Sequence, residues 1–232
     1  MSFPHQRPRR LRQSAALRRL VAETRIHPNQ LILPAFIKEG VGEPQPIASM
    51  PGVVQHTTDT LKAAAAEAAQ LGVGGIMLFG IPAQRDATGS ASLDPEGVLN
   101  AAIRDVKAEV GDAVDSALQG DRKTYQMDPA NRTEGLLEVS LDLEEGADMV
   151  MVKPAMSYLD IVRDVADMAD VPVSAYQISG EYAMIEAAAA NGWIDRKAAI
   201  IESVLSIRRA GADTVLTYWA AELARWIQED SL

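Results

Sequence analysis

The chain has 232 residues, of which 47% are hydrophobic and 23% are charged, and its formal net charge is −10. A chain of this length and composition can bury a core of its own, so we expect a globular protein and neither a disordered nor a fibrous one. It contains no cysteine, which excludes disulfides, cysteine-ligated zinc and thiolate catalysis and favours a reducing compartment such as the cytoplasm. No apolar run approaches the roughly 20 residues of a membrane-spanning helix, so no membrane segment is expected.

The N-terminal region differs in charge from the rest of the chain. Residues 1–25 contain seven arginines and a single acidic residue, Glu23, whereas the remainder is strongly acidic. Leucines lie among the arginines, which favours an amphipathic arm that docks on protein, and its charge suits docking on a neighbouring subunit of a homo-oligomer. A targeting segment and a nucleic-acid arm are the alternatives. Against nucleic acid, the arginines have no aromatic residues among them and the body is acidic.

Strands and helices alternate along the remaining chain. Apolar runs predict five strands, at 31–37, 76–81, 148–153, 172–178 and 213–218. Helices are predicted at 58–71, 96–110, 133–145, 158–169, 181–191, 196–210 and 220–229. Asp59 and Asp195 are the expected N-caps of two of these helices. Residues 112–132 show no strand pattern.

This alternation predicts an α/β fold whose parallel sheet is covered on both faces. The sequence Gly-Ala-Asp joins a helix to a strand twice, at 146–148 and at 211–213. The repeated junction favours a (β/α) barrel over a doubly wound sheet. No Gly-x-Gly-x-x-Gly motif follows a strand, which weakens the dinucleotide-binding alternative.

Candidate functional side chains are those at the carboxyl ends of the strands, where parallel α/β folds place their sites. These are Lys38, Lys153, Ser179 and Tyr218. Lys153 ends the apolar run 149–152, where desolvation disfavours the ammonium and leaves a neutral amine able to attack a ketone. The alternative is a lysine that extends to water or pairs with a carboxylate.

Further polar residues have two interpretations each. Arg122, in a loop that also contains Gln126, suits a carboxylate that it would bind with two hydrogen bonds, or it belongs to a solvated basic loop. Ser179 and Tyr218 suit an anionic substrate, or they bond to backbone groups. The three histidines are scattered without ligand spacing, so a zinc site made from them is not expected.

Long stretches spread over nearly the whole chain match one known family in the same order. They are RPRRLR (7–12), LPAFIKEG (33–40), SMPGV (49–53), LFGIP (78–82), GVLNAAIRDVKAEVGD (97–112), GDRKTYQMDPANR (120–132), EGADMVMVKP (145–154), SYLDIVRDV (157–165), AYQISGEYAMI (175–185), RRAGAD (208–213) and TYWAAE (217–222). On these stretches the chain resembles the porphobilinogen synthase (delta-aminolevulinic acid dehydratase) family. The resemblance implies a (β/α)8 TIM barrel with an N-terminal arm that wraps a neighbour in a homo-oligomer. It also implies a hydro-lyase that condenses two 5-aminolevulinate molecules into porphobilinogen in tetrapyrrole (heme) biosynthesis.

The resemblance also assigns roles to individual residues. It implies that Lys153, in the motif Met-Val-Lys-Pro, forms a Schiff base with the substrate. It implies that Arg122 and Gln126 bind substrate from the active-site lid, and that Ser179 and Tyr218 bind the carboxylate of the second substrate. Glu138 falls where many bacterial members place a ligand of an allosteric magnesium ion. No organic cofactor is implied.

The match to the family is interrupted after residue 113. By residues 114–120 the sequence has jumped to the segment before the lid motif. The stretch that would hold an active-site zinc or magnesium ion is absent, as are the Pro-Ser-Gly-Met loop and the strand with a second Schiff-base lysine. Five strands where a barrel has eight leave a gap of roughly 90 residues, at about 30 for each βα unit. We therefore expect an arm at 1–30 and an incomplete barrel at 31–232, with an internal deletion near 112–119.

Three functions follow as hypotheses. The first is a working porphobilinogen synthase. The second is a non-catalytic relative that joins or regulates oligomers of a full-length synthase. The third is an imine-forming enzyme of the aldolase type that uses a single lysine.

Overall fold

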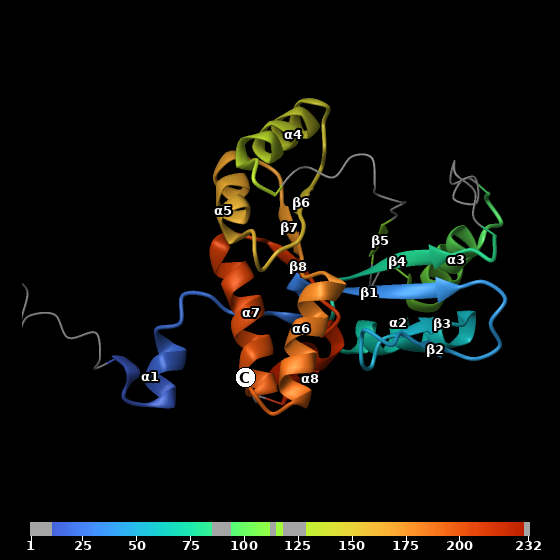
Figure 1. Cartoon of the computed structure of the whole chain (residues 1–232), viewed down its shortest axis with the longest axis horizontal. Coiled ribbons are helices and arrows are strands. Elements are labelled where there is room, and N and C mark those ends of the chain that lie inside the picture. The colour runs from blue at the N-terminus through green and yellow to red at the C-terminus, as the bar shows by residue number, and fades with distance from the viewer. Residues whose placement is uncertain (1–10, 85–93, 112–114, 118–128, 230–232) are drawn as a thin grey trace, which may run out of the picture.

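Six parallel strands form the centre of the fold, in the spatial order β5-β4-β1-β8-β7-β6 (Figure 1). The computed structural model describes residues 11–84, 94–111, 115–117 and 129–229. These six strands are β1 (Leu31–Lys38), β4 (Gly75–Ile81), β5 (Asp115–Ala117), β6 (Val150–Val152), β7 (Val173–Tyr176) and β8 (Thr214–Leu216). Two short strands, β2 (Gln45–Pro46) and β3 (Val54–His56), extend the sheet beside the carboxyl end of β1.

The order of the strands is that of a (β/α) barrel. Successive parallel strands are neighbours, and the last strand, β8, pairs with the first, β1, with Leu31 opposite Val215. Within the described residues, β5 and β6 each pair with a neighbour on one side only. The circle of strands is therefore interrupted between β5 and β6, and the sheet is not closed.

The five predicted strands are confirmed, but the prediction that 112–132 contains no strand is wrong at β5. The three residues of β5 include no β-branched side chain and no apolar run, so no pattern in the sequence indicates a strand. They pair with β4 through the backbone, with Ser116 opposite Ile76. This short strand therefore forms because it pairs with the longer strand β4.

The predicted helices are all present, with ends displaced by one or two residues. They are α2 (Thr58–Gln70), α3 (Val98–Val110), α4 (Arg132–Glu144), α5 (Leu159–Met168), α6 (Ser179–Ala190), α7 (Arg196–Ala210) and α8 (Ala220–Gln228). Asp195 is confirmed as an N-cap, since its carboxylate accepts a hydrogen bond from the Ala198 amide. The N-cap of α2 is Thr57 and not Asp59, because the Thr57 hydroxyl accepts from the Thr60 amide. Asp59 instead places negative charge in the first turn, where the helix dipole favours it.

Both Gly-Ala-Asp junctions contain a glycine with positive φ. The angle is +93° at Gly146 and +120° at Gly211, so both helices end in a conformation that suits glycine. The surroundings differ, because a Cβ on Gly211 would lie 2.6 Å from the Cβ of Ala166, whereas no atom lies within 4 Å of the same position on Gly146. Only the second junction brings a helix end into close contact with a neighbouring helix.

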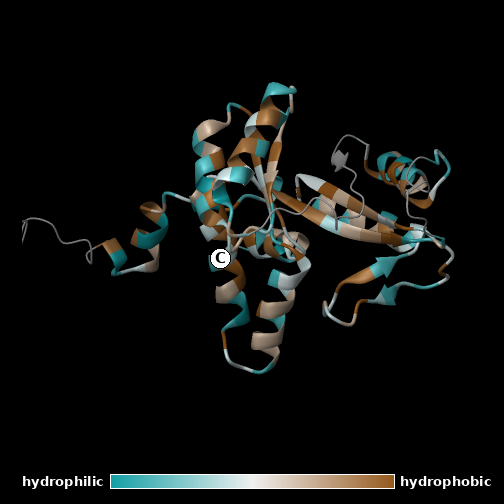
Figure 2. Ribbon diagram, turned by 45° about the horizontal axis from the view of Figure 1, so that its top comes forward, coloured by the Kyte–Doolittle hydropathy of each residue, from teal (hydrophilic) through white to brown (hydrophobic). Residues whose placement is uncertain are grey.

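The two faces of the sheet have different roles. Apolar side chains on the outer face pack against the helices and form the main core, and the strands are among the most hydrophobic parts of the ribbon (Figure 2). A smaller cluster lies on the inner face, with Met77, Tyr176 and Leu216 buried at its centre. This inner face leads to the candidate site.

The described start of the N-terminal arm, residues 11–25, lies away from this core, whereas Ile26 is buried in it. Helix α1 (Ala15–Leu20) has no buried residue, and Leu11, Leu20 and Val21 are exposed. Figure 1 shows α1 standing apart from the sheet and its helices. A 3-10 turn at Pro28–Gln30 then leads into β1. Among the described residues, no helix is both long enough and apolar enough to cross a membrane.

Candidate functional site

Four aromatic rings gather on the inner face, at the carboxyl ends of four strands. Phe36 stacks on Phe79 at a centroid distance of 5.3 Å and on Tyr218 at 6.1 Å. Tyr176 lies 6.3 Å from Phe79 and 6.2 Å from Tyr218. Residues two apart on a strand share a face, so Phe79 follows Met77 into the interior and Tyr218 follows Leu216. We call these four residues the aromatic cluster.

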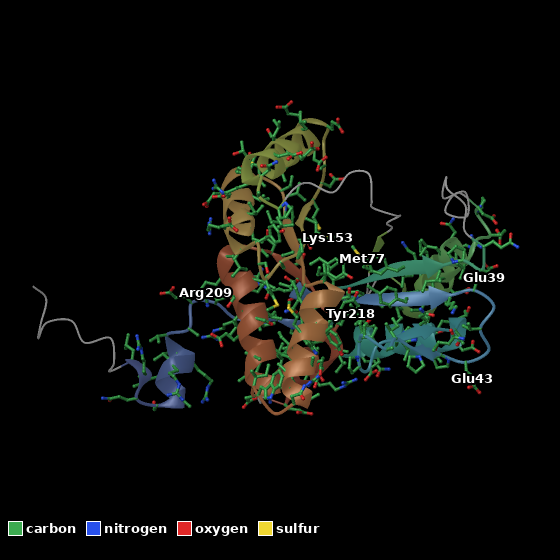
Figure 3. The ribbon with its side chains drawn as sticks, in the orientation of Figure 1. Glu39, Glu43, Met77, Lys153, Arg209 and Tyr218 are labelled. Carbon is green, nitrogen blue, oxygen red and sulfur yellow. The ribbon has the colours of Figure 1, made fainter. Side chains whose placement is uncertain are left out.

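Lys153 reaches this cluster from the end of β6. Its Nζ lies 5.6 Å from the centroid of the Tyr176 ring, within the range of a cation–π contact. The side chain is half-buried, and it shares the inner face with Met151, two residues earlier. Figure 3 labels Lys153 together with Met77 and Tyr218, two residues of the inner-face cluster. A primary amine therefore lies against an apolar, aromatic lining.

The Tyr218 hydroxyl forms a hydrogen bond with the Tyr176 hydroxyl, with an O–O distance of 2.6 Å. In such a pair one hydroxyl donates to the other, and a phenolic hydroxyl is chemically able to bond to a polar ligand such as a carboxylate. Ser179 is the first residue of α6 and its side chain is exposed. Ser179 and Tyr218 thus follow the neighbouring strands β7 and β8 at the same edge of the sheet.

A partly buried polar network holds the backbone beside Tyr218. The indole Nε1 of Trp219 donates to the Glu186 carboxylate at 2.7 Å, and Arg196 donates to both Glu186 and Glu222. Burial raises the pKa of Glu186, but hydrogen bonds from Arg196 and Trp219 outweigh this and hold it below its ordinary value. The Tyr182 ring contacts Tyr218 edge-on at 5.4 Å. Trp219 is thereby fixed, and with it the adjoining tyrosine.

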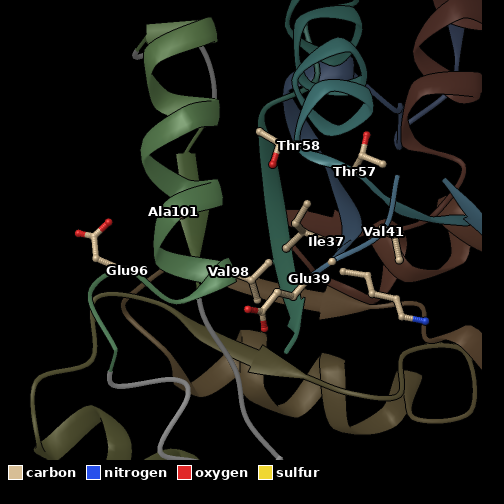
Figure 4. Close-up of a pocket in the computed structure, with 10 residues that line it drawn as sticks. Ile37, Glu39, Val41, Thr57, Thr58, Glu96, Val98 and Ala101 are labelled. Atoms are coloured by element: carbon tan, nitrogen blue, oxygen red, sulfur yellow. The ribbon is translucent and has the colours of Figure 1, made fainter. Parts of the chain in front are cut away.

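A separate cavity of about 240 Å³ lies at the carboxyl end of β1, between the first turns of α2 and α3 (Figure 4). Its wall includes Lys38 and Glu39 and none of the aromatic cluster. Lys38 donates to the side-chain oxygen of Gln45 at 2.7 Å, and Glu39 accepts from the Ala83 amide at 2.8 Å. Lys38, a strand-end candidate in the sequence, therefore bonds to the short strand β2, at the wall of a cavity that the aromatic cluster does not line. The aromatic lining around Lys153 suits imine chemistry better than this cavity does.

The remaining predicted site residues are not brought to Lys153 by the described structure. Arg122 and Gln126 lie outside the described residues. Glu138 is exposed on α4. Across the described ranges, no three His, Asp or Glu side chains come together as metal ligands. A single exposed carboxylate does not by itself fit a magnesium site, so the allosteric metal at Glu138 stays a prediction.

Sequence reasoning missed three of the four aromatic residues and one buried carboxylate, Glu181. Phe36, Phe79 and Tyr176 lie in continuous apolar runs, in which nothing distinguishes the inner face from the outer. Their positions are near the strand ends: Phe36 and Phe79 lie two residues before the ends of β1 and β4, and Tyr176 is the last residue of β7. Glu181 occupies the third position of a helix, where a carboxylate can bond to the helix start.

Comparison with known proteins identifies the family. The sequence profile of delta-aminolevulinic acid dehydratase matches residues 5–114 and, as a second segment, residues 111–226. The chain belongs to the delta-aminolevulinic acid dehydratase family. The two matched segments meet at 111–114, where the sequence analysis placed the interruption.

Curated members of the family align with the chain from end to end. The delta-aminolevulinic acid dehydratase of Streptomyces coelicolor is 47% identical over 325 aligned positions, covering 98% of each chain. That of Mycobacterium tuberculosis strain H37Rv is 43% identical over 324 positions, covering 97% of this chain and 98% of the relative. Both alignments are much longer than the 232 residues of this chain, so a long stretch of each relative has no counterpart here.

A solved structure shares the fold. The delta-aminolevulinic acid dehydratase (porphobilinogen synthase) of Toxoplasma gondii, crystallised in complex with the reaction product porphobilinogen, superimposes with a TM-score of 0.85. The identity is 29%, and the match covers 97% of this chain and 92% of that chain. This similarity confirms the predicted TIM-barrel family, here with an open sheet.

Proposed function

We propose that this chain binds 5-aminolevulinate in the porphobilinogen synthase reaction and forms an imine with it through Lys153. The observation that carries the proposal is the position of the Lys153 amine against the Tyr176 ring, at the carboxyl edge of a barrel-ordered sheet. Membership of the family supplies the substrate. The Toxoplasma gondii relative, crystallised with porphobilinogen, has the same fold.

The proposed chemistry begins with the Lys153 amine attacking the substrate ketone. The carbinolamine that forms loses water and leaves a cationic imine, which withdraws electrons and acidifies the adjacent carbon. The face of the Tyr176 ring lies where it stabilises that positive charge, because a ring face attracts cations. None of these reaction steps is assigned to a metal ion.

Binding of the substrate carboxylates is assigned to polar groups around the amine. One carboxylate is assigned to Ser179 and to the bonded hydroxyls of Tyr218 and Tyr176, a proposal supported by their common place at the carboxyl ends of the neighbouring strands β7 and β8. Arg122 and Gln126 are assigned to the same role from the sequence. Holding both reacting molecules in this way makes their condensation effectively intramolecular.

We infer that complete turnover to porphobilinogen is weak, because the second Schiff-base lysine is missing. The chain has six lysines, at positions 38, 62, 107, 123, 153 and 197. Among the described ones other than Lys153, Lys38 bonds to Gln45, Lys62 pairs with Glu109, Lys107 is exposed in the last turn of α3, and Lys197 lies over Trp226. The split match to the family profile and the open sheet between β5 and β6 support an internal deletion near 112–119.

Borohydride trapping tests the proposal. Purified chain, free of host synthase, is incubated with 5-aminolevulinate and sodium borohydride, and the modified peptide is located by mass spectrometry. We expect one reduced adduct on Lys153, none in Lys153→Met, and an unchanged adduct in the matched control Lys38→Met. Trapping that persists in Lys153→Met would refute the assignment. Rapid formation of porphobilinogen by the same preparation would refute weak turnover.

The exposed arm favours a second candidate, a non-catalytic subunit that joins oligomers of a full-length synthase. Helix α1 exposes Leu20, has no buried residue, and belongs to a basic segment of an otherwise acidic chain. Opposite charge favours the docking of such an arm on a neighbouring subunit. Co-purification with a full-length synthase is the expected result, and association that is unchanged after deletion of residues 1–25 would exclude the arm as its cause.

A further inference from the structure

Glu181 is a buried carboxylate, with only 3% of its surface exposed. Its hydrogen bonds in the structure come from backbone amides. Ile178 donates at 2.9 Å, Met156 at 2.7 Å, and Ala155 at 3.4 Å. A buried carboxylate needs such donors, because its charge has lost the solvation of water.

The three amides belong to the two loops that contain the proposed reacting groups. Ala155 and Met156 follow Lys153 in the loop between β6 and α5, and Ile178 directly precedes Ser179 at the start of α6. In an ordinary capping box, a carboxylate at this third helical position bonds only to the start of its own helix. Here the Glu181 carboxylate also reaches a loop 25 residues earlier in the chain.

We propose that Glu181 is a positioning residue, which holds the Lys153 loop and the Ser179 loop at a fixed separation. The inference rests on the proposed function, since it concerns the loops that carry the imine-forming amine and a carboxylate-binding hydroxyl. Hydrogen bonds to a charged acceptor are stronger than neutral ones, and three of them restrain both loops. Gln177 adds a restraint between the same loops, because its Nε2 donates to Met156 Sδ at 3.2 Å.

The replacement Glu181→Gln tests this role, because it keeps the shape and places an amide NH2 against backbone donors. The matched control is Asp213→Asn. The Asp213 carboxylate also accepts from a backbone amide, that of Val173 at 2.8 Å, and also joins two segments, but at the opposite ends of the strands. Both replacements weaken a bond from a backbone amide to a carboxylate, buried at Glu181 and exposed at Asp213, and only the first touches the loops at the site.

The measurement is the rate constant for borohydride-trapped imine formation on Lys153 with 5-aminolevulinate, taken together with the final amount of adduct. A loss of folded protein lowers the amount and leaves the rate constant unchanged. Displacement of the amine lowers the rate constant. We expect a decrease of about tenfold or more in Glu181→Gln, because small errors of position are costly for reacting groups, and less than about twofold in Asp213→Asn. Equal rate constants in the two variants would overturn the inference.

Amide hydrogen exchange at Ala155 and Met156 separates this inference from the proposed function. If the unmodified chain traps no 5-aminolevulinate, the proposed imine fails, and exchange still reports whether Glu181 restrains the loops. We expect exchange at these two amides to be about tenfold faster in Glu181→Gln and unchanged in Asp213→Asn. Exchange that is unaltered in Glu181→Gln would refute the restraint itself.

Discussion

Replacement of Gly211 by alanine tests the packing of the second Gly-Ala-Asp junction against α5. Gly211 has a φ of +120° and its position leaves no room for a Cβ, which would lie 2.6 Å from the Cβ of Ala166. Gly146→Ala is the matched control, because its junction has the same sequence and a positive φ of +93° but open space around the Cβ position. The difference between the two variants therefore measures the close approach alone.

The magnitudes follow from these geometries. An alanine with positive φ costs about 1 to 2 kcal/mol, which is the expected loss for Gly146→Ala. Overpacking against Ala166 adds about 1 to 3 kcal/mol, so we expect Gly211→Ala to lower the free energy of unfolding by about 3 kcal/mol. For a chain of this size, that loss corresponds to a fall in Tm of roughly 6 to 12 °C.

Urea unfolding followed by tryptophan fluorescence measures both losses, because the buried Trp219 reports on the core. The replacement Ala166→Gly removes the atom that the new methyl group meets, so in combination with Gly211→Ala it should cost less than the sum of the two single changes. The same Ala166→Gly change should give simple additivity with Gly146→Ala. Equal losses in Gly146→Ala and Gly211→Ala, or additivity in both combinations, would refute the packing argument.

Three further predictions concern a helix cap, a buried phenol and the site. Thr57→Ala should lower the free energy of unfolding by about 1 kcal/mol and Asp59→Ala by less than about half of that, as measured by urea unfolding, because only the threonine caps α2. Burial, with repulsion from Glu186, raises the pKa of Tyr182 to about 12 from 10.0. The protonated phenol therefore contributes stability that is complete below pH 10 and is lost as the pH rises towards 12. The expected loss in the free energy of unfolding is about 1 to 2 kcal/mol after allowance for solvent screening, as measured by urea unfolding at pH 10 and pH 12. If Tyr182→Phe lost as much stability over this pH range as the unmodified chain does, the prediction would be contradicted. Tyr176→Phe removes the hydroxyl that bonds to Tyr218. It should raise the 5-aminolevulinate concentration that gives half-maximal borohydride trapping by about 2- to 10-fold. An unchanged concentration would show that the hydroxyl pair does not bind the substrate.

Much of the fold is predictable because the parallel strands are marked by apolar runs. Strands β1, β4, β6, β7 and β8 and the seven helices from α2 to α8 all correspond to such patterns or to helical periodicity. The repeated Gly-Ala-Asp junction indicated a barrel, and the pairing of β8 with β1 agrees with it. Strand β5 was missed because backbone pairing with β4 creates it, and pairing between distant segments leaves no local signal.

The candidate site was predictable only in part. Lys153 was identifiable from its place at a strand end, and the structure adds the Tyr176 ring against which it lies. Lys38 also follows from its place at a strand end, and the structure adds its bond to Gln45 of the short strand β2, a pairing that the strand pattern does not indicate. The contact between Glu181 and Met156 joins residues of different loops, and no periodicity in the sequence reveals it.

The pairing of β1 with β8 also governs how the protein can be assembled from its parts. Among the described strands, it is the only pairing that joins the segment before residue 118 to the segment after residue 128. Phe36 and Phe79 come from the first segment, whereas Lys153, Tyr176 and Tyr218 come from the second. The aromatic lining is therefore complete only after the C-terminal strand has been synthesised, so a ribosome-bound N-terminal half carries no imine site. Two separately expressed halves would have to associate before the site could form, through this strand pair and through contacts such as the bond from the Tyr182 hydroxyl to the Pro51 carbonyl.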